Sequence, residues 1–105
     1  MSEFLIKVPQ ALEVGSRTVT VTYDPLILEK EGVHGQSIYR NQEIVVGYHQ
    51  VAPLRDLTFW HEILHMVNHC YLDGKLTESE IDAMGEGTFQ VLKQLGIRFD
   101  WSERS

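Results

Sequence analysis

The chain has 105 residues, of which 43% are hydrophobic and 23% are charged, and its formal net charge at pH 7 is −6. These values predict one small globular domain, residues 1–105, with its own core. The negative charge argues against nucleic acid and anionic membranes as partners, and the apolar runs are too short to span a bilayer. The N-terminus lacks the layout of a signal peptide. The single cysteine, Cys70, excludes an internal disulfide, so we expect a cytoplasmic protein.

The first half of the chain predicts short strands separated by turns. Residues 4–8 form an apolar stretch that ends before a proline, and residues 17–23 alternate between valine or tyrosine and threonine, as a half-buried strand does. Residues 26–30 follow an Asp-Pro pair and predict a short helical turn. Residues 36–39 and 43–47 predict a β-hairpin.

The second half predicts two helices and a last short strand. A long helix is expected from Pro53 to about Leu72, where an Asp-Gly pair closes it. The capping box Thr77-Glu78-Ser79-Glu80 predicts a second helix that begins at about Glu78 and ends at Gly96, before a strand at residues 97–101. Strands followed by helices predict an α+β fold, with an antiparallel or mixed sheet of three to four strands and the helices packed on it.

The long helix carries the motif His61-Glu62-Ile63-Leu64-His65. On a helix, His61 and His65 lie one turn apart on the same face, opposite a wide apolar face that must be buried. Two imidazoles placed in this way can bind one zinc ion. Glu62 can then reach a water on that ion and act as a general base.

A catalytic zinc site needs a third protein ligand and an open position. His69 lies eight residues from His61, about 12 Å along a helix, which is too far for it to share the same ion. Glu80 already has a role as half of the capping box. Glu78 and Asp82 lie in the first turn of the second helix, where the helix dipole favours carboxylates, so a structural role explains them at least as well as a metal.

Glu86 lies in the middle of the second predicted helix, between Gly85 and Gly87. Each glycine inside a helix costs about 1 kcal/mol relative to alanine. Close approach of the first helix would explain why two glycines flank one carboxylate. These observations make Glu86 a candidate ligand beside Glu78 and Asp82.

The motif at residues 61–65, followed by twenty residues and then Glu86, resembles the gluzincin arrangement of thermolysin-like peptidases. The size of the chain and the order of its elements are similar to those of single-domain minigluzincins and of small phage-type metallopeptidase-like proteins. The resemblance covers roughly residues 33–95 and is strongest at residues 58–92. It implies a zincin-like fold and a Zn²⁺ cofactor, with His61, His65 and Glu86 as ligands and Glu62 as the general base.

Two departures from the gluzincin pattern concern the surroundings of the metal. Thermolysin-like enzymes carry an aspartate four residues after the third ligand, whereas this chain has Gln90, whose amide oxygen can accept an imidazole N–H without a charge. Those enzymes also have a second subdomain that donates a histidine or tyrosine to the transition state, for which this chain has no room. The candidate substitutes are Tyr39, Tyr48, His49, His69 and Tyr71.

We therefore expect a zinc-dependent metallopeptidase that hydrolyses a peptide or protein with a water activated by Glu62. An extended peptide is expected to lie along the strand at residues 43–47. The alternative is a zinc-binding interaction or regulatory protein that hydrolyses nothing. The small size and the missing transition-state donor favour this alternative, but the intact Glu62 argues against it.

Overall fold

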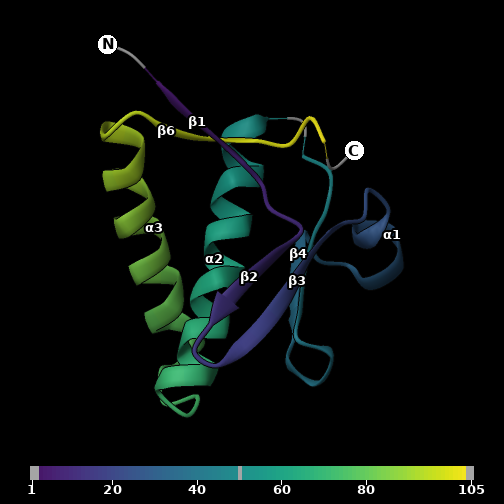
Figure 1. The fold of residues 1–105 in the computed structure, drawn as a ribbon, viewed down its shortest axis with the longest axis vertical. Helices are drawn as coiled ribbons and strands as arrows, with labels where there is room; N and C mark the ends of the chain where they lie inside the picture. Colours follow the sequence, from purple (N-terminus) through teal and green to yellow (C-terminus); the bar gives the residue numbers. More distant parts are fainter. Residues whose placement is uncertain (1–2, 50, 104–105) are drawn as a thin grey trace.

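The computed structural model describes residues 3–49 and 51–103, which form an α+β fold (Figure 1). The strands are β1 (Phe4–Lys7), β2 (Ala11–Val14), β3 (Arg17–Tyr23), β4 (Gly35–Ile38), β5 (Glu43–Val46) and β6 (Ile97–Asp100). The helices are α1 (Ile27–Glu31), α2 (Ala52–Tyr71) and α3 (Glu78–Gln94), and a 3₁₀ turn, η1 (Tyr39–Asn41), joins β4 to β5. None of the helices in the described ranges is long and apolar enough to cross a membrane.

The larger sheet has four strands in the order β2-β3-β5-β4. Its outer pairs, β2 with β3 and β4 with β5, are antiparallel, and the central pair, β3 with β5, is parallel. The predicted hairpin is confirmed by β4 and β5. The sheet is mixed, which is one of the two forms that we expected. The strand β2 was not predicted, because it has only four residues.

The strands β1 and β6 form a separate, parallel, two-stranded sheet. Figure 1 shows α2 between the larger sheet and α3, and α3 packs on α2 and on β6. The prediction that both helices pack on one sheet is therefore wrong in part. The apolar face of α2 covers the larger sheet, and α3 packs on another side of α2.

The main core lies between β3, β5 and α2. Val19, Val21, Ile44 and Val46 are fully buried, as the alternation of β3 and β5 requires, and they belong to the same cluster as Phe59 of α2. Because this cluster buries the apolar side of α2, the histidine side of that helix is left beside β4 and α3.

Asp56 of α2 joins the C-terminal strand to the core. Its carboxylate is 2% exposed and accepts hydrogen bonds from Trp101 Nε1 at 2.9 Å and from the backbone N–H of Phe99 at 3.2 Å. The Phe59 ring packs edge-on against both aromatic rings, with centroids 5.2 Å apart in each pair. This arrangement fixes the N-terminal half of α2, one turn before the histidine motif.

The loop between α2 and α3 turns the start of α3 back over α2. The predicted capping box is confirmed, because Thr77 Oγ1 accepts the N–H of Glu80 at 3.1 Å and Glu80 Oε1 accepts the N–H of Thr77 at 2.8 Å. The buried side chain of Asn68 accepts the N–H of Leu76 at 3.1 Å and donates to its carbonyl at 3.4 Å. These bonds fix where α3 begins relative to the histidines.

Candidate metal centre

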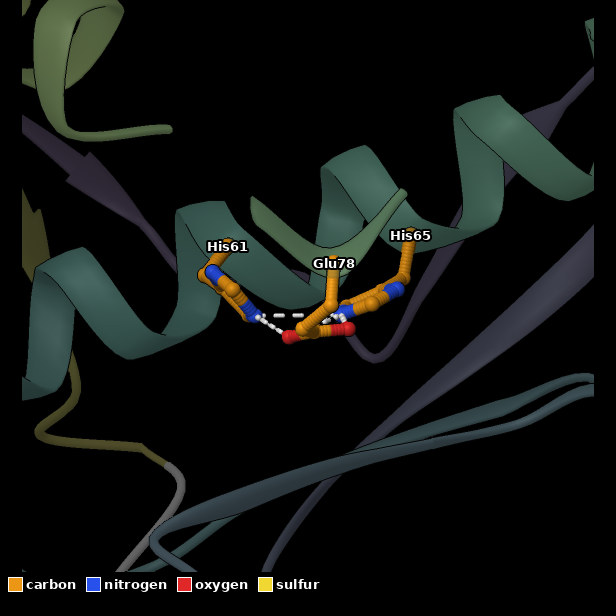
Figure 2. A group of neighbouring side chains, drawn as sticks. All are labelled: His61, His65 and Glu78. Carbon is orange, nitrogen blue, oxygen red and sulfur yellow. Dashed lines mark hydrogen bonds and ion pairs between the residues drawn. The ribbon is translucent and has the colours of Figure 1, made fainter. Parts of the chain in front are cut away.

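His61 and His65 project from α2 toward the first residue of α3, Glu78 (Figure 2). Their Nε2 atoms lie 3.0 Å apart. Oε1 of Glu78 lies 3.3 Å from Nε2 of His61 and 3.3 Å from Nε2 of His65. Three atoms that can each donate a lone pair thus form a nearly equilateral triangle, which we call the ligand triangle.

The ligand triangle has the dimensions of one face of a tetrahedral metal site. With metal–nitrogen and metal–oxygen bonds of about 2.0–2.1 Å, two ligand atoms of a tetrahedron lie roughly 3.3 Å apart. Two imidazoles and one carboxylate form a set of three protein ligands that is typical of catalytic zinc, with a fourth position left for water or substrate. The residues therefore fit a zinc ion.

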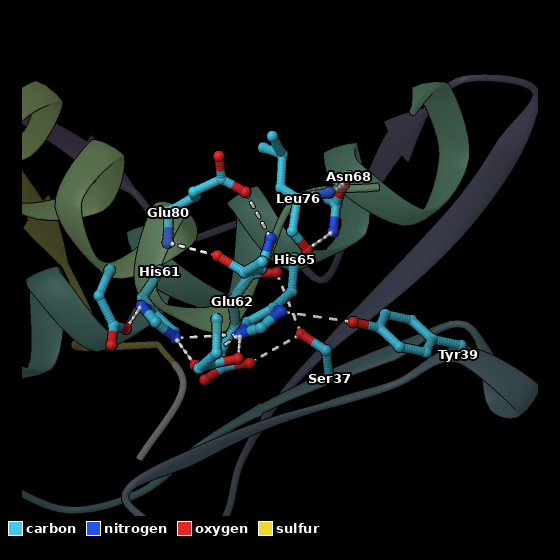
Figure 3. A network of polar contacts seen from close by, with 11 residues as sticks. Ser37, Tyr39, His61, Glu62, His65, Asn68, Leu76 and Glu80 are labelled. Atoms are coloured by element: carbon cyan, nitrogen blue, oxygen red, sulfur yellow. Dashed lines mark hydrogen bonds and ion pairs between the residues drawn. The ribbon is translucent and has the colours of Figure 1, made fainter. Parts of the chain in front are cut away.

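The other ring nitrogens of the two histidines also face polar groups (Figure 3). Nδ1 of His61 lies 3.4 Å from Oδ1 of Asp82, and Nδ1 of His65 lies 3.4 Å from the hydroxyl of Tyr39. The Tyr39 ring is held by stacking on His69, with centroids 4.3 Å apart. In the tautomers that place the proton on Nδ1, these contacts keep both Nε2 lone pairs pointing into the ligand triangle.

Glu62 lies beside the ligand triangle and is 7% exposed. Its Oε1 accepts a hydrogen bond of 2.7 Å from the hydroxyl of Ser37, which also lies 3.1 Å from the Glu62 carbonyl oxygen. Burial raises the pKa of Glu62, while the Ser37 hydrogen bond and the two histidines oppose this shift in pKa. Nothing in the sequence singled out Ser37, because a serine in a short strand carries no motif.

Gly35, at the start of β4, allows this strand to lie close to the motif. A Cβ atom at this position would collide with Cγ2 of Thr58 and would lie 3.2 Å from Oε2 of Glu62. Any larger residue would therefore separate β4 from α2, and Ser37 from Glu62.

Three hollows surround the site. One of about 310 Å³ is lined by β4 and the ligand triangle, and a second of about 270 Å³ is lined by His61, Glu62 and Glu86, among others. A third, of about 600 Å³, lies between the start of α2 and the end of α3 and has a mainly apolar wall that includes Leu57 and Phe89. Leu57 and Glu86 line both the second and third hollows, so these form one groove that reaches His61 of the ligand triangle.

Glu86, the third ligand expected from the gluzincin spacing, is exposed and lies in the wall of this groove. The structure brings His61 and His65 together with Glu78 instead. We had expected the flanking glycines to allow a close approach of α2. This expectation is wrong, because both positions have room for a side chain. A Cβ at Gly85 would make ordinary contacts at 3.6 and 3.8 Å, and one at Gly87 would have no neighbour within 4 Å. Glu86 remains a candidate on its spacing alone.

Most of the residues considered as transition-state donors have other partners. Tyr39 faces the rear of His65, and the hydroxyl of Tyr71 accepts the N–H of Gly15 at 3.0 Å. His69 contacts Arg17, Tyr48 is exposed, and His49 stacks on His34 and contacts Thr58. Gln90, expected behind a histidine, lines the large hollow.

No protein-family model matches this chain, and no curated protein or solved structure matches it. The resemblance to gluzincins therefore stays an expectation from the motif, and the assignment that follows rests on the geometry of the site.

Proposed function

We propose that the protein is a zinc-dependent hydrolase of peptide bonds, with His61, His65 and Glu78 as the zinc ligands and Glu62 as the general base. The observation that carries this proposal is the ligand triangle, with sides of 3.0, 3.3 and 3.3 Å, beside a buried glutamate of the same helix. A zinc ion bound there supplies a Lewis acid that polarises a carbonyl and acidifies a water.

Glu62 is suited to move a proton because its two oxygens have different surroundings. Ser37 holds Oε1, and within the described residues Oε2 has no hydrogen-bond donor. Oε2 is therefore the atom that would take a proton from the attacking water and pass it to the leaving amine. The raised pKa of Glu62, caused by burial, makes its carboxylate a stronger base than an exposed glutamate.

The strand β4 supports a peptide as the substrate. It is at an edge of the larger sheet and lines the hollow beside the ligand triangle, so an extended peptide can add to its open side. The expectation that a peptide lies along residues 43–47 is wrong, because β5 is already paired with β3 on one side and β4 on the other. An apolar side chain of the substrate would enter the groove at Leu57 and Phe89.

A zinc-binding protein without hydrolytic activity is the second candidate. It is favoured by the contacts of Tyr39 and Tyr71, whose hydroxyl groups face His65 Nδ1 and Gly15 N and not the open side of the site. On this alternative, β4 and the groove would bind a peptide segment of a partner and release it intact.

A peptide-library digest with zinc-loaded protein, read by mass spectrometry, tests the proposal together with the metal content per chain. We expect one zinc per chain and cleavage by the wild type. Glu62→Gln should keep the zinc and lose the cleavage, and His61→Ala should lose both. If wild type and Glu62→Gln both bind zinc and neither cleaves any peptide, the non-hydrolytic candidate replaces the hydrolase. If the wild type binds no zinc, both candidates fail.

A further inference from the structure

The two-stranded sheet of β1 and β6 exposes much apolar surface. Phe4, Leu5 and Ile6 of β1 are 60%, 68% and 45% exposed, and Figure 1 shows both strands at the end of the molecule away from the β2–β3 turn. A sheet of two strands is marginally stable in water, and an apolar edge strand is a template for pairing with another strand.

The hydrogen bonds of β1 show which of its groups are free to pair. The N–H of Phe4 donates to Gly96 O at 2.7 Å, and the N–H of Val8 donates to Asp100 O at 3.0 Å. Successive residues of a strand point their N–H and C=O groups to opposite sides, so those of Leu5 and Lys7 point away from β6. In the described part of the chain, β6 is the only strand that pairs with β1.

We propose that β1 pairs in antiparallel orientation with β1 of a second copy of this chain, with Leu5 opposite Leu5. This register follows from the side chains. It places Phe4 opposite Ile6, so apolar side chains face apolar ones. Glu3, which pairs with Arg98 at 3.2 Å, and Lys7, which pairs with Glu103 at 2.8 Å, come opposite each other, so no charge is placed against an apolar side chain. A shift by two residues in either direction would place Leu5 opposite a charged side chain, Glu3 or Lys7.

The same register satisfies the backbone. Residues 3, 5 and 7 carry the outward N–H and C=O groups, and pairing centred on Leu5 places them opposite residues 7, 5 and 3 of the second copy. The product is a four-stranded sheet, β6-β1-β1-β6, with two-fold symmetry and no open edge on β1. The ligand triangle lies on α2 and α3, so this proposal stands apart from the proposed function.

Disulfide trapping tests the register directly. In an antiparallel hydrogen-bonded pair the Cα atoms lie about 5.5 Å apart, which is within the range of a disulfide. Leu5→Cys should therefore give a covalent dimer under mild oxidation. Phe4→Cys should not, because its counterpart is Ile6. The wild type, which contains Cys70, gives the background. If Phe4→Cys is trapped as readily as Leu5→Cys, the register is wrong.

Light scattering over a concentration series tests the association itself. The wild type should approach twice the chain mass of 12.1 kDa as its concentration rises. Leu5→Lys should shift dimerisation to at least tenfold higher concentration, because it places two lysines opposite each other at the centre of the register. Thr18→Lys, which adds the same charge at an exposed position of β3, should leave dimerisation unchanged. A wild type that stays monomeric throughout the series, or a Leu5→Lys variant that dimerises at the same concentration as the wild type, overturns the proposal.

Discussion

The hydroxyl of Ser37 donates a hydrogen bond of 2.7 Å to Oε1 of Glu62 and so joins the edge strand β4 to the motif helix α2. The serine touches neither histidine of the ligand triangle in the contacts that the structure shows. It fixes one oxygen of the proposed base and leaves the other available. In the proposed function, metal binding and proton transfer therefore depend on different residues, and substitutions can separate them.

Ser37→Ala should lower kcat at least tenfold while zinc affinity stays that of the wild type. The reason is positioning: without the bond from Ser37 the carboxylate of Glu62 can rotate, and misplacement of a reacting group by about 1 Å can cost roughly 100-fold in rate. Ser37→Thr keeps the hydroxyl and should recover most of the activity. Steady-state kinetics and a competitive zinc titration measure the two effects. Loss of zinc by Ser37→Ala would show that Ser37 supports the ligands and not the base.

Glu78→Gln should weaken zinc binding by more than the 10–100-fold that is typical of residues behind the ligands. Asp82→Asn, which alters only the contact at Nδ1 of His61, should fall within that range. Glu86→Gln and Glu80→Gln should bind zinc as the wild type does, because the former lies in the groove and glutamine still serves in a capping box.

Zinc titration of these four variants, each first shown by circular dichroism to be folded, decides between the two candidates for the third ligand. If Glu86→Gln loses zinc while Glu78→Gln keeps it, the gluzincin spacing is correct and the ligand triangle is not the metal site.

Asp56→Asn should lower the free energy of unfolding by about 3 kcal/mol, because it weakens two hydrogen bonds to a buried charged acceptor. Asparagine can still accept from Trp101, but its amide would place a donor against the N–H of Phe99. Urea denaturation measures the change. Glu13→Gln, at an exposed position in β2, should stay within about 0.5 kcal/mol of the wild type. Equal stability of the two variants would contradict a structural role for Asp56.

Gly87→Ala should raise the free energy of unfolding by about 1 kcal/mol, because alanine is the better helix former and nothing lies within 4 Å of the new Cβ. Thermal unfolding should show a midpoint higher by roughly 4 °C. Gly74→Ala is the matched control with the opposite sign, because Gly74 has a φ of +70° that alanine adopts only with strain. A destabilised Gly87→Ala would contradict the open surroundings of this position.

The helices could be predicted closely because their signals are local. The capping box at Thr77 and Glu80 fixed the start of α3, and the proline near the start of α2 and the glycine after its end bounded that helix within a residue or two. Strand pairing was less accessible, because it joins segments far apart in the chain. The parallel pairing of β1 with β6 joins Phe4 to Ile97, and no turn between them carries a signal for it.

The motif residues could be placed on one helix face from sequence, but their partners could not. A carboxylate in the first turn of a helix has the same signature whether it favours the helix dipole or binds a metal, so Glu78 was left among several candidates. What distinguishes it is the path of the loop before it, which depends on packing. Ser37 became visible only once β4 was placed against α2.

If the proposed zinc site is correct, the two hydrogen bonds between Asn68 and Leu76 connect the loop before Glu78 to zinc affinity. Residues 72–77 must be ordered before Glu78 can face the histidines, so any gain in loop order pre-organises the site and lowers the dissociation constant for the metal. By reciprocity, zinc bound at the proposed site should protect the same loop from local unfolding, and its backbone amides should exchange more slowly with solvent in the zinc-loaded protein.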